Sequence, residues 1–412
     1  MIKDSGPTRI PFRALITMCG ETIENGELII ERGVIQSIST EGGRSGPGDL
    51  PDFSDCLILP GFVNAHSHLA LSALEGMIPK REKFTDWAKE LVPVNGNLNP
   101  MKRREVMLQK FPVLFRSGVT ILADYLADPE LIEEFEKLPI RTLVFLEVLG
   151  FKNEFAEPLA HEAEKILAKY QSPHPLMKVG LAPHAPYTVS PELFHKLRGL
   201  ADRYSCPFSC HVAEFPEEVR FLKDGKGEMH DLHLQLGSFE ETWTPPRETP
   251  LRYLEKLGVL DSMIAVHLNH IDGDIDLLLS RDVGAVFCPG TTRWFGRKQK
   301  MPVKQLIQRG AAVGIGTDSL ASNETLNFLH ELRTAEELLP ELTRMEILGM
   351  ATQGGARVLG FNGGCLAPGK PADFIGFKIK KIPDSWADVP FETGREKVDI
   401  SMVAGVPLNL EG

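Results

Sequence analysis

The sequence lacks the features that mark membrane and secreted proteins. No apolar run in its 412 residues approaches the ~20 residues that a membrane helix needs. The N-terminal stretch, MIKDSGPTRIPFRALITM, has no continuous apolar region followed by a small-residue cleavage site, so we expect no secretory signal. These two absences predict a cytoplasmic protein without membrane contact.

Basic runs and paired cysteines are also missing. The formal net charge is -11 and no Lys/Arg-rich run occurs, which argues against nucleic acid as a partner. Six cysteines are scattered over the whole chain, a usage that suits reduced thiols better than a disulfide framework. With 42% hydrophobic and 25% charged residues, the composition is that of a globular protein long enough for one large domain and a smaller one.

Eight short apolar runs recur in the middle of the chain and predict strands. They lie at residues 62–68, 118–125, 141–150, 177–185, 206–214, 263–270, 284–290 and 311–319. Most are nearly continuous rather than alternating, as expected for parallel strands covered on both faces. Helical patterns lie between them, including one that ends at Gly118 and one that begins with Ser190 as N-cap and Pro191 at the first position. The alternation predicts an α/β fold with a (β/α)8 TIM barrel over residues 59–363, and a doubly wound open sheet is the alternative.

The two ends of the chain have a different character. Residues 1–58 and 364–412 contain short strands broken by Gly turns, and we expect them to pair into one small β-sandwich domain. Residues 223–250 form a less regular stretch that is too long for an ordinary connection, and such loops commonly act as lids or binding loops. Within it, His230 and His233 lie one helical turn apart, which predicts a solvated surface pair, with substrate contact as the alternative.

Imidazoles and carboxylates follow the carboxyl ends of the predicted strands, the rim where barrel active sites are built. These residues are His66, His68, His184, His211, Glu214, His267 and Asp318. His66 and His68 are one residue apart, so in a strand they share a face and can bind one ion. Three neutral imidazoles and one carboxylate suit a borderline cation such as Zn²⁺ and leave a position free for water. We therefore predict one Zn²⁺ per chain, with Fe²⁺ as the alternative, bound by His66, His68, His211 and Asp318.

Other residues at the same rim are candidates for chemistry and substrate binding. A metal ion lowers the pKa of a bound water from about 15.7 toward 7. Glu214 is placed to carry a proton from that water to the leaving group, and His267, or alternatively His270, to stabilise developing charge. Glu147, which ends the run 141–150, and Trp243 in the long loop are predicted substrate contacts, with a structural role as the alternative for each.

Jointly, the motifs resemble the amidohydrolase superfamily, and specifically its mononuclear branch of adenosylhomocysteine, methylthioadenosine, aminofutalosine and cytosine deaminases. The matching motifs, in the family's order, are PGFVNAHSHLALS, HAPYTVS, HVAE, VHLNH, CPGTT and GIGTDSLASNETL. The resemblance implies a hydrolytic deaminase that removes an exocyclic amino group from a purine or adenosine-like small molecule and releases ammonia. It further implies that Asp318 accepts a proton from the water, that His184 faces the substrate, and that the chain forms a homodimer.

The chain also departs from its relatives. Binuclear members carry a carbamylated lysine at the end of the fourth strand, where this chain has His184, and this favours a single metal. Aminofutalosine-type members tend to carry Glu at the position of Ala70 and Ser-Asn at Thr291 and Thr292, so the substrate stays open. The alternative activities are hydrolysis of a ring amide or a carbon-halogen bond, or deamination of guanine, cytosine or a pterin. A scaffold protein without activity is disfavoured because every ligand and Glu214 are present.

Overall fold

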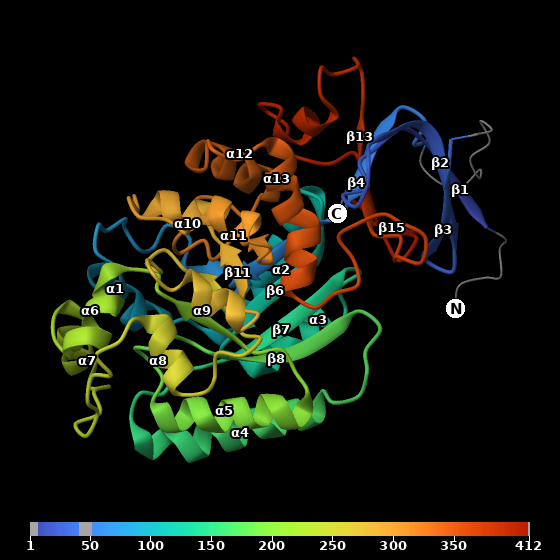
Figure 1. Cartoon of the computed structure of the whole chain (residues 1–412). Coiled ribbons are helices and arrows are strands. Elements are labelled where there is room, and N and C mark those ends of the chain that lie inside the picture. The colour runs from blue at the N-terminus through green and yellow to red at the C-terminus, as the bar shows by residue number, and fades with distance from the viewer. Residues whose placement is uncertain (1–6, 41–51, 411–412) are drawn as a thin grey trace.

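The computed structural model describes residues 7–40 and 52–410, which two sheets organise (Figure 1). The larger sheet has eight strands in the order β8-β7-β6-β5-β12-β11-β10-β9. Its members are β5 (Phe62–Ser67), β6 (Val119–Leu126), β7 (Arg141–Val148), β8 (Met177–Pro183), β9 (Ser209–Val212), β10 (Ile264–His267), β11 (Gly284–Phe287) and β12 (Val313–Ile315).

This sheet is parallel throughout and closes on itself. All seven neighbouring pairs in the order run parallel. The outer strands β8 and β9 meet through a bridge between Leu181 and Phe208, where Leu181 N–H donates to the Pro207 carbonyl at 2.9 Å. The predicted (β/α)8 barrel is therefore confirmed, and the open sheet is excluded.

Helices follow the strands, as the sequence pattern predicted. They are α1 (Phe84–Gly96), α2 (Pro100–Arg116), α3 (Ile132–Phe135), α4 (Ala156–Lys169), α5 (Pro191–Tyr204), α6 (Pro216–Asp224), α7 (Glu228–Leu236), α8 (Pro250–Lys256), α9 (Ile275–Ser280), α10 (Pro289–Trp294), α11 (Val303–Gln308), α12 (Phe328–Leu338), α13 (Arg344–Gly349) and α14 (Gly355–Val358). The 3₁₀ helices are η1 (Leu69–Leu74), η2 (Pro129–Leu131), η3 (Asn153–Phe155) and η5 (Trp386–Phe391), and η4 (Met350–Gly354) is a π-helix. None of the described helices is long and apolar enough to cross a membrane.

Two predicted helix ends are confirmed by their hydrogen bonds and dihedral angles. The Ser190 hydroxyl accepts the Leu193 N–H at 3.2 Å, with Pro191 in the first helical position of α5. Gly118 follows the cap of α2 with φ of +93°, a left-handed conformation that favours glycine.

The strands read as continuous apolar runs because both of their faces are buried. Neighbouring residues in one strand, such as Ile121 and Leu122 in β6 or Leu143 and Val144 in β7, belong to different apolar clusters and are almost fully buried. Side chains on both sides thus fix each strand, and with it the position of the residues that follow its carboxyl end.

The two chain ends build the second sheet, whose seven strands run in the order β15-β14-β13-β4-β1-β2-β3. They are β1 (Thr8–Leu15), β2 (Ile23–Glu31), β3 (Val34–Ser39), β4 (Cys56–Pro60), β13 (Phe374–Lys378), β14 (Ile400–Val403) and β15 (Val406–Pro407). β13 pairs antiparallel with β4, which joins the two ends as predicted. The domain boundaries at 58 and 364 stay a prediction, and residues 1–6, 41–51 and 411–412 of the predicted domain lie outside the described residues. In Figure 1 this sheet lies on one side of the barrel, and α6 and α7 lie on the opposite side.

The stretch 223–250 is more regular than predicted. It contains α7, which is flanked by Gly227 (φ +100°) and Gly237 (φ +65°) and buries Met229 and Leu232 on one face. The two glycines delimit a short amphipathic helix. It contains too few turns for its apolar periodicity to be recognised in the sequence.

Candidate active site

Four predicted ligands converge at the carboxyl ends of β5, β9 and β12. His68 Nε2 and His211 Nε2 lie 3.2 Å apart, and Asp318 Oδ1 lies 3.6 Å from His66 Nε2 and 3.9 Å from His68 Nε2. Candidate ligand atoms of His66, His68 and His211 lie within 4.8 Å of one another, as do those of His66, His267 and Asp318. All of these side chains are buried. Residues far apart in the sequence thus form a His/His/His/Asp metal-binding group.

The donor atoms of this group fit a cation. Both ring nitrogens of His66 are buried without a hydrogen-bond partner in the described structure. His211 Nδ1 donates to the His184 carbonyl at 2.7 Å, so its Nε2 carries a lone pair directed at His68. Burial lowers the pKa of His68 to about 3 and the pKa of His211 well below its ordinary value, so both imidazoles are neutral. Converging lone pairs without donors are stabilised by a metal ion.

A second group of potential ligands, Glu147, His184 and His211, overlaps with the first. The neutral imidazole of His211 has one free lone pair, because its other nitrogen donates to the His184 carbonyl. The two groups therefore share this lone pair and cannot both use it, and the number of metal ions per chain stays a prediction.

Buried hydrogen bonds hold the ligand-bearing segments in register. Asn64 Nδ2 donates to the Thr317 hydroxyl at 2.8 Å, and Thr317 N–H donates back to Asn64 Oδ1 at 3.1 Å. One Asp124 oxygen accepts the Ser67 hydroxyl at 2.7 Å and the Leu69 N–H at 2.9 Å. The residues on both sides of His68 are therefore fixed by one carboxylate, a contact that the sequence analysis did not predict.

The backbone around the site adopts an unusual conformation. Ala213, His267, Leu268 and Asp318 have φ values of 54°, 77°, 49° and 57°, in the left-handed region that non-glycine residues rarely occupy. Each segment is held by hydrogen bonds, such as Asp318 N–H to the His66 carbonyl at 3.0 Å. The fold thus maintains strained turns where strands end at the site.

Glu214 lies between His267 and Arg297 at the edge of the metal-binding group. Its carboxylate is 3.6 Å from His267 Nε2 and 3.8 Å from the Arg297 guanidinium. Burial raises the pKa of Glu214 to about 8, and the Arg297 charge opposes this rise. His267, not His270, is the imidazole that faces Asp318, at 4.0 Å. Glu214 is therefore a buried carboxyl whose pKa suits proton transfer near neutral pH.

Arg297 was not predicted as a site residue. It lies in a loop after α10, and a loop has no periodic pattern of apolar residues from which the position of its side chains could be predicted. Its guanidinium lies 4.4 Å from the Phe295 ring centroid and 5.6 Å from that of Phe215, and it is buried beside Glu214. A buried cation at this position favours the ionised form of Glu214.

Arg297→Met is expected to move the acidic limb of the kcat/KM profile to higher pH. Loss of the guanidinium raises the pKa of Glu214 further, so a higher pH is needed to ionise the carboxylate that accepts a proton. The pH profile of Arg297→Met, with Arg297→Lys as the charge-conserving control, measures this shift. An unchanged acidic limb in Arg297→Met would contradict it.

Glu218 holds the turn that carries Glu214. Its two carboxylate oxygens accept the N–H groups of Ala213 and Glu214, each at 2.9 Å, and its side chain is fully buried. The sequence contains this residue four positions after Glu214, but gives no sign that it turns back on the strand end.

Glu218→Gln is expected to destabilise the protein by about 1–3 kcal/mol and to lower kcat. The amide offers one acceptor where two N–H donors need partners, so one buried donor is left unpaired. Denaturant unfolding and kcat of Glu218→Gln test this expectation, with Glu192→Gln, at an exposed position of α5, as the control variant. Wild-type stability and kcat in Glu218→Gln would refute the positioning role.

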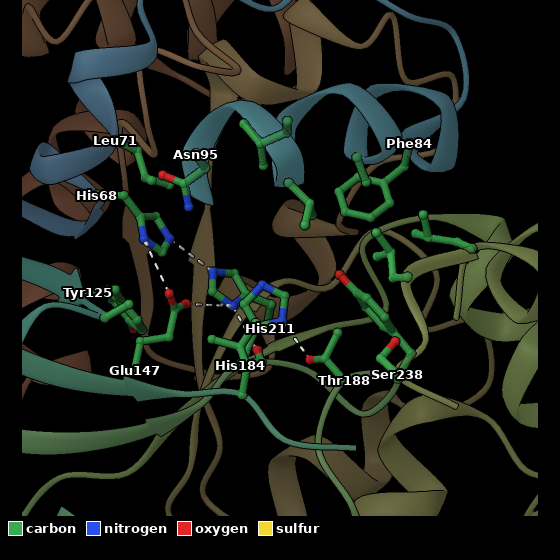
Figure 2. A pocket seen from close by; sticks show the side chains of 18 of the residues that line it. His68, Leu71, Phe84, Asn95, Tyr125, Glu147, His184, Thr188, His211 and Ser238 are labelled. Atoms are coloured by element: carbon green, nitrogen blue, oxygen red, sulfur yellow. Dashed lines mark hydrogen bonds and ion pairs between the residues drawn. The ribbon is translucent and has the colours of Figure 1, made fainter. Parts of the chain in front are cut away.

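The predicted substrate contacts have different surroundings. The Thr188 hydroxyl donates to the Ala185 carbonyl at 3.3 Å, so His184 Nδ1 donates to Thr188, 2.7 Å away, and its Nε2 stays an acceptor. Glu147 lines the same cavity, and its Oε1 is buried without a hydrogen-bond partner in the described structure. Both residues therefore have free acceptor atoms for substrate. Figure 2 shows His184 and Glu147 beside His211.

Trp243 and His233 differ from their predictions. The Trp243 ring stacks on Phe221, with centroids 4.6 Å apart, and Trp243 is not among the described residues that line the cavity. Its ring packs against Phe151, which lines the cavity, so this geometry favours the structural alternative for Trp243. His233 is buried rather than solvated, since its two nitrogens bond to the Ser238 hydroxyl at 2.8 Å and the Tyr187 carbonyl at 2.6 Å.

A cavity of about 590 Å³ opens from the metal-binding group. Its inner end is lined by His68, His211, Glu214, His267 and Asp318, and its outer part lies between α1, α7 and the segment after β7. This volume lies in the range of small-molecule sites. Ala70 lines the cavity, and the Thr291 hydroxyl donates to Asp318 Oδ2 at 2.9 Å, so both departures from the aminofutalosine pattern lie at the site.

A (β/α)8 barrel with a His/Asp group and a buried carboxyl at its C-terminal rim defines the class of metal-dependent hydrolases. The model of the amidohydrolase family matches residues 57–408. The chain belongs to this family, and the resemblance predicted from the motifs is confirmed.

The chain is similar to several deaminases. The chain is 30% identical to a 5-methylthioadenosine/S-adenosylhomocysteine deaminase of Pelotomaculum thermopropionicum, over 85% of this chain and 79% of that protein. It is 29% identical to a 5'-deoxyadenosine deaminase of Methanothermobacter thermautotrophicus, over 90% and 85%. A zinc-bound adenosine deaminase from Xanthomonas campestris has a TM-score of 0.81 at 25% identity, over 97% of this chain and 92% of that one.

Proposed function

We propose that this chain is a zinc-dependent hydrolytic deaminase of adenosine-like small molecules, acting in the cytoplasm. The observation that carries the proposal is the placement of Glu214 and His267 beside Asp318 at one edge of the ligand group, facing the cavity. The names of the two deaminase relatives support the substrate class.

His66, His68, His211 and Asp318 would hold the metal. When bound, Zn²⁺ supplies Lewis acidity that makes water a nucleophile near neutral pH. Asp318 and Glu214 are the carboxylates that can take protons from the attacking water, and the raised pKa of Glu214 lets it release a proton again.

The reaction consumes water and releases ammonia. Glu214 takes one proton from the attacking water and delivers it to the adjacent ring nitrogen, as the water oxygen bonds to the amine-bearing ring carbon. Asp318 takes the second water proton and passes it to the amino group, whose bond to carbon then breaks, so that ammonia leaves and the ring carbonyl forms. Neutral His267 can donate or accept a hydrogen bond beside the reacting carbon, since burial lowers its pKa to about 3. His184 Nε2 and Glu147 accept hydrogen bonds from the substrate and so orient it.

An ammonia-release screen tests the proposal. The zinc-loaded protein is incubated with adenosine, 5'-deoxyadenosine, methylthioadenosine, S-adenosylhomocysteine, guanine and cytosine, and separately with a ring amide and a carbon-halogen compound. The oxo product is measured in parallel. We expect one ammonia per oxo product from the adenosine compounds. Turnover of a ring amide or carbon-halogen compound, with no ammonia from any amine, would replace the proposal by the alternative activity.

A further inference from the structure

The outer part of the cavity is a chamber with apolar walls. This space, which we call the apolar chamber, is lined by Leu91 and Val92 of α1, Leu149 and Phe155 after β7, and Leu232 and Leu236 of α7. In Figure 2, Leu71 and Phe84 lie on the side of the cavity opposite His184 and His211. A ligand that reaches from the metal-binding group into this chamber therefore passes from polar to apolar surroundings.

The rim of the chamber contains hydrophobic side chains that are exposed to solvent. Val92, Leu149, Phe155 and Leu236 are 39% to 48% exposed, although all four are large and apolar. They come from three separate segments and meet around one opening. Exposed apolar groups gathered at one cavity are typical of a binding surface, because a ligand that covers them removes apolar area from water.

The ionic groups near the chamber are largely neutralised. Arg103 pairs with Asp128 at 2.9 Å and also donates to the Asn95 carbonyl, so neither charge is free for a ligand. His233 is neutral, since burial lowers its pKa to about 4, and both its nitrogens are hydrogen-bonded. Lys152 is the remaining cation among the described lining residues, and the carboxylate that interacts with it, Glu240, already accepts hydrogen bonds from Asn153 N–H and from the N–H and hydroxyl of Thr242. A zwitterionic group would thus bury charge without a matching pair.

We infer that the apolar chamber binds an uncharged, apolar substituent of the substrate, such as an alkylthio group, and disfavours an amino-acid substituent. The inference rests on the proposed deaminase function and extends it. The names of relatives include substrates that differ at this substituent, methylthioadenosine and S-adenosylhomocysteine in one protein and 5'-deoxyadenosine in another. This chain would select the uncharged members.

A substrate series tests the selection. We expect kcat/KM to rise about fourfold for each methylene added to a short 5'-alkylthioadenosine, the equivalent of about 0.8 kcal/mol per buried CH₂. S-adenosylhomocysteine is expected to react at least about tenfold less efficiently than methylthioadenosine. Equal or better turnover of S-adenosylhomocysteine would overturn the inference.

A variant of the rim provides the second test. Leu236→Arg adds a cation to the chamber at an exposed position. It is expected to lower the ratio of kcat/KM for methylthioadenosine to kcat/KM for S-adenosylhomocysteine about tenfold. Leu234→Arg is the matched control, since Leu234 is exposed on the same helix and is not among the lining residues. An equal change in both variants, or no change in Leu236→Arg, would contradict a role of the chamber in specificity.

The same experiments distinguish failure of the proposed deaminase function from failure of the chamber inference. If no adenosine compound releases ammonia, the deaminase function is wrong. If ammonia is released without the expected preference, only the chamber inference is wrong. Calorimetry of methylthioadenosine binding to Glu214→Gln, in which turnover is slowed, measures binding apart from the reaction: we expect a negative heat-capacity change that becomes more negative with longer alkyl groups, and a constant value would count against apolar burial.

Discussion

Glu214→Gln is expected to lower kcat about 10²–10⁴-fold while the protein still binds its metal and substrate. The amide cannot accept and release a proton, although it has the same shape as the carboxyl. The change leaves the hydrogen bonds of the turn intact, because Glu218 binds the backbone N–H of Glu214 and not its side chain. Steady-state kinetics combined with metal analysis measures the effect.

The control for this substitution is Glu192→Gln on the exposed surface of α5. Glu192 pairs with Lys196 in water, and such a surface pair contributes little to stability. Wild-type kcat in Glu214→Gln would remove Glu214 from the reaction. Loss of metal from Glu214→Gln would instead assign it a structural role.

Removal of the metal is expected to abolish activity and to destabilise the fold. A ligand that binds the native state alone adds about 2.7 kcal/mol of stability at a free concentration of 100 Kd. A chelator should therefore lower the free energy of unfolding by roughly this amount, and added Zn²⁺ should restore both stability and activity. Unfolding curves with and without chelator measure the effect independently of turnover.

His66→Ala should reproduce the chelated state, because both nitrogens of His66 lack a hydrogen-bond partner in the described structure and are available to a metal ion. His161→Ala, on the exposed side of α4, is the control that should bind metal normally. Full metal content in His66→Ala would contradict its assignment as a ligand.

The barrel and the ligand group could be predicted because strand periodicity and strand ends are local properties. Continuous apolar runs mark buried parallel strands, and the residue after each run must lie at the carboxyl rim. His211 and Asp318 could therefore be placed together although more than a hundred residues separate them. The spacing of two histidines in one strand added the third and fourth ligands.

The residues that support this group could not be predicted, since their roles depend on loops and on side-chain direction. Arg297 reaches Glu214 from a loop, and Glu218 turns back onto a strand end through a backbone contact. Trp243 lies in the expected segment but packs behind Phe151, because Phe221 on α6 and Phe239 after the end of α7 contact its ring. His233 is buried by the same face of α7 that buries Leu232.

Some predictions wait for experiments of another kind. The identity of the metal, the homodimer and the cytoplasmic location stay predictions. The domain boundaries likewise await a test by limited proteolysis. None of them alters the arrangement of the ligands around the cavity.

The decisive experiment measures ammonia release from methylthioadenosine as a function of the Zn²⁺ added per chain to metal-free protein. We expect the rate to rise in proportion to added zinc and to reach a plateau at one ion per chain, with one oxo product formed per ammonia. A plateau at two ions, or a rate that is independent of zinc, would contradict a single site formed by His66, His68, His211 and Asp318.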